Sequence, residues 1–280
     1  MTKMLKAVAI AALTVFGSAN AALINKVDLF SVDQALITDN FGTGGTSVSS
    51  QVGSAADNSI APNVGTILGG YRELIVDKKS DGTVFGDNIN RSVNMGVSHG
   101  QLDFSTSSLT TGTGIIRWDG ITQSASGGAI QAINRNGLGS GPLGVNLGNA
   151  LTDQFELTTV FSDGGFTFRI EAYTYNDFNS WTAVDIVSNQ HLVPTVSYVP
   201  LNAFLACGFS DAVVTVTCGT SGPVDFSNLG ALQAIIDPNG TQTSLDLTLD
   251  QVTVVPEPSG IALVGLALLG LGVTARRRKV

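Results

Sequence analysis

Residues that could carry out chemistry are few in this chain and widely spaced. The two histidines, His99 and His191, have no metal-ligand partner at helix or strand spacing. The sequence contains neither G-x-S-x-G nor H-E-x-x-H, so two common hydrolase arrangements are excluded. Carboxylate pairs for glycoside hydrolysis meet only in the fold, and 22 acidic residues would supply such a pair by chance. We therefore predict no catalytic residue and a protein that is not an enzyme.

Aromatic side chains are the next candidates, because an exposed ring offers an apolar face with a polar edge to a sugar. The candidate glycan contacts are Trp118, Trp181, Tyr173 and Tyr175. Tyr173 and Tyr175 are two residues apart, so on a strand they would share a face. Against this hypothesis, only 7% of the chain is aromatic, and Trp118 lies in a strand-like segment that could belong to the core.

Three aspartates are weaker candidates, in this case for calcium. Asp246 and Asp250 share one face of the last predicted strand, and Asp28 is expected opposite them. Carboxylate oxygens are the ligands that calcium prefers. A solvated acidic surface explains the same residues. We therefore predict no metal site and no cofactor, and keep calcium as the alternative.

The two cysteines, Cys207 and Cys218, are predicted to form a disulfide. Neither has a nearby histidine and their spacing is not C-x-x-C, which argues against a metal or redox site. A single pair of cysteines in an exported protein usually forms a disulfide. Closing this loop would contribute roughly 2.5–3 kcal/mol in the chain-entropy model.

The charge of the central part of the chain is strongly acidic. The whole sequence has a formal net charge of −8, but residues 22–255 contain eight cations and 21 acids, a net charge near −13. Such a body repels nucleic acid and anionic lipid headgroups. We therefore expect no nucleic-acid partner.

Strand patterns dominate these central residues. Residues 244–255 alternate plainly between apolar and polar residues. Residues 155–175 read as two strands around Asp163-Gly164-Gly165, whose glycines tolerate the positive φ angles of a tight hairpin. Residues 228–236 fit a short helix or a strand equally well. The pattern predicts an all-β ectodomain over 22–253, a single β-sandwich of the jelly-roll kind, with the segments near Val27–Ser31 and Leu245–Val254 side by side.

The N-terminal 21 residues have the features of a secretory signal peptide. Two lysines precede an uncharged apolar stretch at residues 7–16, and Ala19-Asn20-Ala21 follows as an A-x-A cleavage site. The apolar stretch is about half the length that a membrane-spanning helix needs. We predict cleavage after Ala21, so that the mature chain begins at Ala22.

The C-terminal segment 254–280 combines a rigid motif, an uncharged helix and a basic tail. Residues 260–275 would form a helix of roughly 24 Å, short of a ~30 Å hydrocarbon core. Prolines at 256 and 258 fix a stiff extended stretch before it. Four cations hold the far end in the cytoplasm: Arg276, Arg277, Arg278 and Lys279. These features predict a weak single-span anchor, suited to being temporary.

The order of Pro256-Glu257-Pro258, a short Gly/Leu/Ala helix and a basic cluster resembles the PEP-CTERM sorting signal of Gram-negative bacteria. That resemblance implies processing by an exosortase, an integral-membrane cysteine protease of the transpeptidase kind, and often a link to exopolysaccharide or biofilm matrix. The body is also similar to ectodomains joined to such signals, in segments such as IIRWDG and CGFSDAVVTVTCG.

The sequence therefore predicts an exported, non-enzymatic protein of the cell surface or extracellular matrix. It would cross the inner membrane, stay there transiently through its C-terminal helix, and be released or transferred by an exosortase-like enzyme. Two alternatives remain for the body: a carbohydrate-binding module with exopolysaccharide as partner, or a secreted hydrolase of matrix polymers.

Overall fold

The computed structural model describes residues 25–40, 47–53, 66–82, 90–120, 132–139 and 142–257. The strands in these ranges are β1 (Asn25–Asp28), β2 (Gln34–Asp39), β3 (Val48–Gly53), β4 (Tyr71–Asp81), β5 (Val93–Ser98), β6 (Gln101–Thr106), β7 (Thr110–Trp118), β8 (Asp153–Ser162), β9 (Phe166–Thr174), β10 (Trp181–Ser188), β11 (Thr195–Pro200), β12 (Val214–Cys218), β13 (Leu229–Ile236) and β14 (Asp246–Pro256). Short 3₁₀ helices are η2 (Leu68–Gly70), η3 (Leu201–Leu205) and η4 (Phe226–Asn228). Within the described residues, no helix has the length and apolar character needed to cross a membrane.

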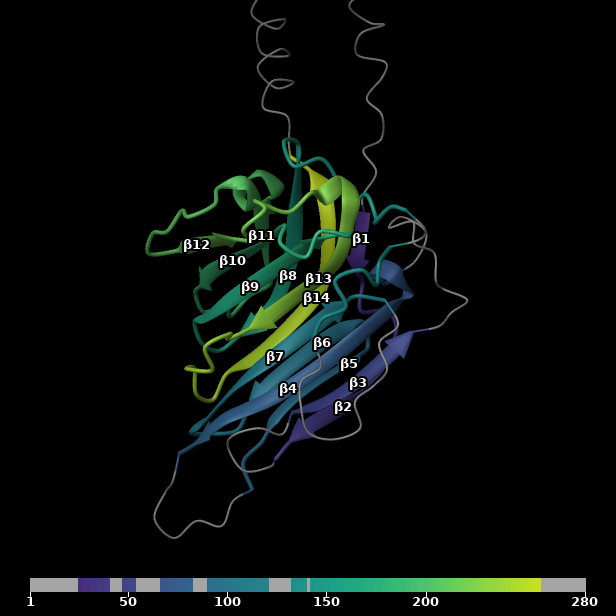
Figure 1. The fold of residues 1–280 in the computed structure, drawn as a ribbon. Coiled ribbons are helices and arrows are strands. Elements are labelled where there is room, and N and C mark those ends of the chain that lie inside the picture. Colours follow the sequence, from purple (N-terminus) through teal and green to yellow (C-terminus); the bar gives the residue numbers. More distant parts are fainter. Residues whose placement is uncertain are drawn as a thin grey trace, which may run out of the picture.

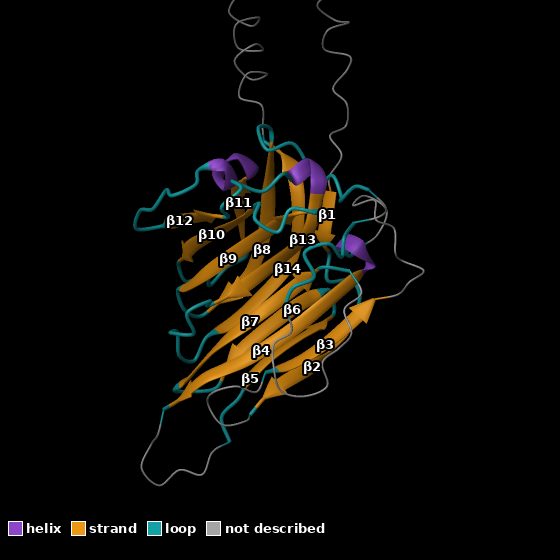
Figure 2. Ribbon diagram, in the orientation of Figure 1, coloured by secondary structure: helices purple, strands orange, loops and turns teal. Residues whose placement is uncertain are grey.

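The strands form two antiparallel sheets that pack face to face as a β-sandwich (Figures 1 and 2). The β8 sheet has the order β11-β8-β14-β6-β5-β2, with β1 also paired to β14. The β9 sheet has the order β12-β10-β9-β13-β7-β4-β3. The predicted all-β sandwich is therefore confirmed.

The chain crosses repeatedly from one sheet to the other, as in a jelly roll. Hairpins join β5 to β6 and β9 to β10, whereas the connections β6–β7, β8–β9, β10–β11 and β13–β14 pass between the sheets. The first and last described strands lie side by side, because β1 pairs with β14 through Asn25 opposite Val254. This pairing was expected from the sequence, and it brings both ends of the described chain to one end of the sandwich (Figure 1).

The alternation in β14 explains how the last strand contributes to the core. Leu247 and Leu249 are buried on one face, as predicted. The pairing with β8 then shifts between Leu249 and Gln251, which is a bulge, and Val252 and Val254 become the buried residues. A one-residue insertion exchanges the two faces of a strand, so the bulge keeps apolar residues inward over the whole length.

Two local expectations are decided by the fold. Residues 228–236, which fitted a helix or a strand, form β13 in the middle of the β9 sheet, and every residue of the strand is buried. The turn at Asp163-Gly164-Gly165 was wrongly read as a hairpin. Its flanking strands belong to different sheets, since β8 pairs with β11 and β14 while β9 pairs with β10 and β13. A turn that crosses between layers does not need the positive φ angles of a tight hairpin.

Candidate functional site

A row of polar side chains crosses the outer face of the β9 sheet. Its members are Glu73 on β4, Arg117 on β7, Gln233 on β13 and Glu171 on β9. The register places each opposite the next, because Glu73 pairs with Arg117, Arg117 with Gln233, and Gln233 with Glu171. Their neighbours along each strand point into the core, so strand alternation directs these four side chains outward. We call them the polar row.

The members of the polar row bind one another in sequence. Arg117 Nη1 lies 3.5 Å from Glu73 Oε2, and Arg117 Nε donates to Gln233 Oε1 at 3.0 Å. The Gln233 amide donates to Glu171 Oε2, and the Tyr173 hydroxyl donates to the same oxygen at 2.6 Å. All four side chains of the row are buried. The row is therefore a fixed array of charged and polar groups rather than a set of mobile surface side chains.

Two carboxylate oxygens at one end of this row have no hydrogen-bond partner among the described residues: Glu73 Oε2 and Asp119 Oδ1. Both residues are buried, because only 3% of Glu73 and 1% of Asp119 is exposed to solvent. The other oxygen of Asp119 accepts from the backbone N–H of Asn134 at 2.8 Å. A buried acceptor without a hydrogen bond costs free energy, so a further donor would stabilise each of these two oxygens.

The electrostatics of the two carboxyl groups follow from this burial. Burial raises the pKa of Glu73, and the nearby charge of Asp119 raises it further, against the lowering effect of Arg117. Burial also raises the pKa of Asp119, against the Asn134 N–H and the charge of Arg117. Both groups are therefore held in a setting that disfavours their negative charge.

An aromatic pair lies at the other end of the row. The rings of Tyr173 and Trp181 are 6.4 Å apart between centroids, and the Arg135 guanidinium lies 4.5 Å from the centroid of the Tyr173 ring. Tyr173 is buried, and burial together with the charge of Glu171 raises the pKa of its hydroxyl. Trp181 is half-buried and retains an exposed part. Of this pair, Trp181 is the ring that an outside ligand could touch.

A salt bridge extends the polar surface along β9 and β10. Arg169 Nε and Nη2 donate to the two carboxylate oxygens of Asp185 at 2.6 and 2.8 Å, and these hydrogen bonds raise the pKa of Arg169. From β4 to β10 the sheet has four inter-strand steps, which is roughly 19 Å. Such a surface carries fixed donors and acceptors over the length of an extended polymer segment, which suits a ligand rich in hydroxyl groups.

The structure corrects the prediction that Trp118 contacts glycans. Its side chain is 1% exposed and lies in the core between the sheets. Its indole N–H donates to Asp28 Oδ2 at 2.9 Å. The apolar segment around Trp118 is a core strand, so the ring faces inward and cannot meet a ligand.

Asp28 is likewise wrong as a calcium candidate. It is fully buried and binds Arg72, whose Nη1 lies 2.9 and 3.1 Å from the two carboxylate oxygens. Burial raises its pKa, against the lowering effects of Arg72 and Trp118. A carboxylate occupied by a guanidinium, an indole N–H and a backbone N–H is a structural group.

The other two calcium candidates do not assemble with Asp28. Asp28 is opposite Val252 in the sheet, whereas Asp246 is exposed at the far end of β14 and Asp250 lies at the bulge. Burial and the neighbouring charge of Asp163 raise the pKa of Asp246. No cluster of three or more acidic, histidine or cysteine side chains suited to a metal occurs within the described ranges.

The remaining sequence candidates occupy separate places. Tyr175 follows the last residue of β9 and is half-buried, and its ring lies so close to Gly139 that a Cβ there would meet it at 1.7 Å. His99 lies in the β5–β6 turn. His191 Nε2 lies 3.0 Å from the hydroxyl oxygen of Ser188. The polar row itself was not identified from the sequence, where only Gln233 is an isolated polar residue within an apolar strand.

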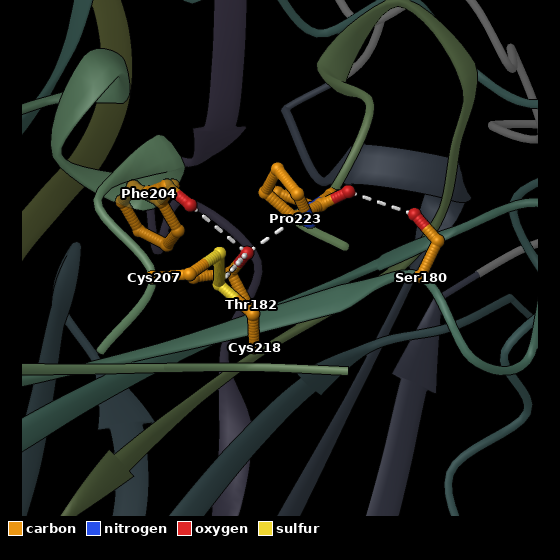
Figure 3. The surroundings of a disulfide bond; sticks show 7 residues. Ser180, Thr182, Phe204, Cys207, Cys218 and Pro223 are labelled. Atoms are coloured by element: carbon orange, nitrogen blue, oxygen red, sulfur yellow. Dashed lines mark hydrogen bonds between the residues drawn. A yellow bond between two sulfur atoms is a disulfide. The ribbon is translucent and has the colours of Figure 1, made fainter. Parts of the chain in front are cut away.

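The predicted disulfide between Cys207 and Cys218 is present (Figure 3). It joins the segment after η3 to the end of β12, so the intervening loop is tied to the edge of the β9 sheet. Beside it, the buried Thr182 hydroxyl donates to the Phe204 carbonyl at 3.0 Å and lies 3.6 Å from Cys218 Sγ (Figure 3). The disulfide therefore supports the fold. Within the described residues, no hydrogen bond links it to the polar row.

The C-terminal motif begins inside the last strand. Pro256 is the final residue of β14 and lies opposite Asp153 on β8. The Glu257 N–H donates to the Thr152 carbonyl at 2.7 Å. Other residues predicted to act in export and sorting lie outside the described residues: Ala19, Ala21, Ala22, Pro258, the helix 260–275, Arg276, Arg277, Arg278 and Lys279.

Comparisons with known proteins give one family and one distant fold. Among solved structures, the chain is similar to the family 11 carbohydrate-binding module from Clostridium thermocellum, determined in complex with a β-1,3-1,4-mixed-linked tetrasaccharide. The identity is 10% and the TM-score 0.32, over 80% of this chain and 96% of that chain, which is too low to say anything about a ligand here. No curated protein matches the chain. Residues 254–279 match the family model of the PEP-CTERM protein-sorting motif, so the chain carries a PEP-CTERM sorting motif, which implies an exported protein processed by an exosortase.

Proposed function

We propose that this is a non-enzymatic protein of the bacterial surface or extracellular matrix, and that its sandwich binds matrix polysaccharide through the outer face of the β9 sheet. In this proposal the N-terminal segment directs export, and the C-terminal helix holds the chain transiently in the inner membrane. An exosortase-like enzyme recognises Pro256-Glu257-Pro258 and releases or transfers the sandwich outward. The match of residues 254–279 to the sorting motif supports this part.

The sorting part is tested by deleting residues 256–258 in the producing cell. We expect uncleaved protein to accumulate in the inner-membrane fraction, because the enzyme loses the motif that it recognises. An internal deletion of the same length elsewhere would disturb the fold, so the matched control is Glu257→Asp, which keeps the charge and both prolines. Normal processing of the deletion variant would refute the role of the motif.

The observation that carries the glycan proposal is the pair of buried oxygens Glu73 Oε2, which faces the Arg117 guanidinium at 3.5 Å without a closer hydrogen bond, and Asp119 Oδ1, which has no hydrogen-bond partner among the described residues. Sugar hydroxyl groups are donors of the kind that these oxygens lack, and the polar row supplies acceptors and donors beside them. Trp181 offers a partly exposed ring on the same face. A polyhydroxylated polymer along this face would satisfy both kinds of group.

The charge of the sandwich narrows the class of polysaccharide. With a net charge near −13 over residues 22–255, the protein repels polyanions at long range. A polymer rich in uronic acids or sulfates is therefore disfavoured. We therefore propose a neutral or amine-bearing polysaccharide. Binding that depends only weakly on salt concentration would indicate the neutral one.

The test is retention of the purified protein on polysaccharide from the cells that produce it, measured by affinity electrophoresis. Trp181→Ala should weaken retention about tenfold or more, the loss expected when an aromatic residue that packs against a ligand is truncated. Tyr198→Ala is the matched control, because Tyr198 is an exposed aromatic residue on β11 of the other sheet. Circular dichroism confirms that both variants fold. No retention of the folded wild-type protein would refute glycan binding.

One observation favours a second candidate function, hydrolysis of matrix polymers. Glu73 and Asp119 are buried carboxyl groups with raised pKa values, and the charge of one raises the pKa of the other. A raised pKa favours the protonated form of a carboxyl group, which is the form that a general acid needs. Release of reducing ends from the same polysaccharide, abolished by Glu73→Gln, would support hydrolysis. Binding without release supports the non-enzymatic proposal.

A further inference from the structure

We infer that the folded sandwich holds Pro256 and Glu257, the first two residues of Pro256-Glu257-Pro258, so that the processing enzyme cuts C-terminal to Glu257. The inference rests on the proposed processing and specifies where along the chain it occurs. The sequence motif covers residues 254–279, whereas β14 extends to Pro256. Motif and sandwich therefore share residues 254–256.

The shared residues are paired within the β8 sheet rather than only lying near it. On β8, the partners of Val254, Val255 and Pro256 are Phe155, Gln154 and Asp153. On its other side, β14 pairs with β1 at Asn25 opposite Val254. Val254 is 1% exposed and belongs to the core, so this end of the strand is fixed by packing as well as by pairing.

The peptide bond between Pro256 and Glu257 is itself engaged. Its N–H group, that of Glu257, donates to the Thr152 carbonyl at 2.7 Å. The turn that carries this carbonyl is braced, because the N–H groups of Thr152 and Asp153 both donate to the Asn149 carbonyl. The Asp153 carboxylate in turn accepts from the Asn149 N–H at 2.7 Å and from the Thr152 hydroxyl at 3.0 Å. The acceptor is therefore held in place.

Cleavage at or before this bond would require the strand to open. In the reaction the peptide C–N bond breaks, the nitrogen leaves with a proton as the amine of the C-terminal fragment, and the carbonyl carbon passes to the enzyme thiol. Water, or a hydroxyl or amine of an acceptor, then takes that carbon from the thiol. An enzyme that holds the residues before the cut as an extended segment would have to withdraw Val254 from the core. A cut beyond Glu257 falls after the last described residue that pairing or a backbone hydrogen bond ties to the sandwich.

The experiment locks the last strand pair in the full-length chain, expressed in the producing cell. Gln154 and Val255 are opposite each other, so the double variant Gln154→Cys/Val255→Cys places two thiols on neighbouring strands without changing Pro256, Glu257 or Pro258. Single-cysteine variants at each position are the matched controls. Intact and C-terminal peptide masses are measured for surface or secreted protein, with non-reducing digestion to identify the new disulfide.

We expect the wild-type protein to end at Glu257 or a later residue, and the locked variant to be processed to the same residue and extent. A wild-type C-terminus at Pro256 or earlier would overturn the inference. So would a locked variant that accumulates unprocessed while both single-cysteine controls are processed. A wild-type chain intact to Val280 would instead refute the proposed processing itself, so the two failures are distinguishable.

Discussion

Two buried clusters, one on each side of the β9 sheet, differ in how completely their carboxylates are hydrogen-bonded. Inside the core, the Asp28 oxygens accept from Arg72, from the Trp118 indole and from the Phe30 N–H. On the outer face, Glu73 Oε2 faces the Arg117 guanidinium at 3.5 Å and makes no closer hydrogen bond, and Asp119 Oδ1 has no hydrogen-bond partner among the described residues. The desolvation penalty is similar in kind for both clusters, and protein groups offset it with more hydrogen bonds in the inner cluster than in the outer one.

The difference separates a structural charge from a functional candidate. A buried carboxylate with all its partners in the protein is explained by the fold, and nothing further is needed. A buried carboxylate with a free oxygen lowers the stability of the unliganded protein, a cost that a ligand could remove. The inner cluster should therefore dominate stability, and the outer cluster should dominate binding.

The largest effect is expected at the centre of the inner cluster. Asp28→Ala leaves the Arg72 guanidinium buried without its counter-charge, which should reduce the free energy of unfolding by about 3–5 kcal/mol. Urea denaturation followed by fluorescence measures this loss. A loss of stability smaller than that of an ordinary surface substitution would show that water reaches Arg72. It would contradict the contrast drawn between the two clusters.

A smaller effect is expected for the indole that completes the inner cluster. Trp118→Phe removes the N–H donor from Asp28 and should cost about 1–3 kcal/mol. Trp181→Phe is the matched substitution on the outer face, where a half-exposed ring should cost less than about 1 kcal/mol. Thermal and urea unfolding of both variants measure the difference. Equal losses would contradict the assignment of one tryptophan to the core and the other to the surface.

The smallest effect is expected for Asp119→Asn, and its sign is opposite. The pKa of Asp119 is raised in the folded state, so ionisation lowers stability as the pH rises through that pKa. Asparagine carries no charge, so the variant should be more stable than the wild type at pH 7. The gain should vanish near pH 3, where the wild-type carboxyl is protonated in both states. A variant less stable at pH 7 would show that the charge is compensated.

Parts of the architecture could be predicted from the sequence, namely those that follow from apolar–polar alternation or from the positions of the first and last strands. The alternation of Leu245, Leu247 and Leu249 predicted the face of β14 that packs inward, and all three are buried. The same reasoning could not detect the bulge that follows, because a bulge is set by pairing with β8 and not by composition. The crossing at Asp163 was missed because the glycines in the turn fit a hairpin equally well.

The site was less predictable because its residues are far apart in the chain. Aromatic residues were ranked by type, yet Trp118 and Trp181 have opposite surroundings that only the sheet register decides. Glu73, Arg117 and Gln233 come together from three strands that span about 160 residues. Gln233 in β13 gave the one clear signal, a polar residue within an otherwise apolar strand, because the strands of Glu73, Arg117 and Glu171 carry other polar residues as well.

The most direct test of the central claim is the titration of individual carboxyl groups by carbon-13 NMR, with and without saturating matrix polysaccharide. Sugar hydroxyls that donate to the free oxygens would stabilise the charged forms, so the pKa values of Glu73 and Asp119 should fall on binding. Asp28 is the internal reference and should not change, because its oxygens are already occupied within the core. Unchanged titration of Glu73 and Asp119 in the bound protein would contradict a glycan site on this face.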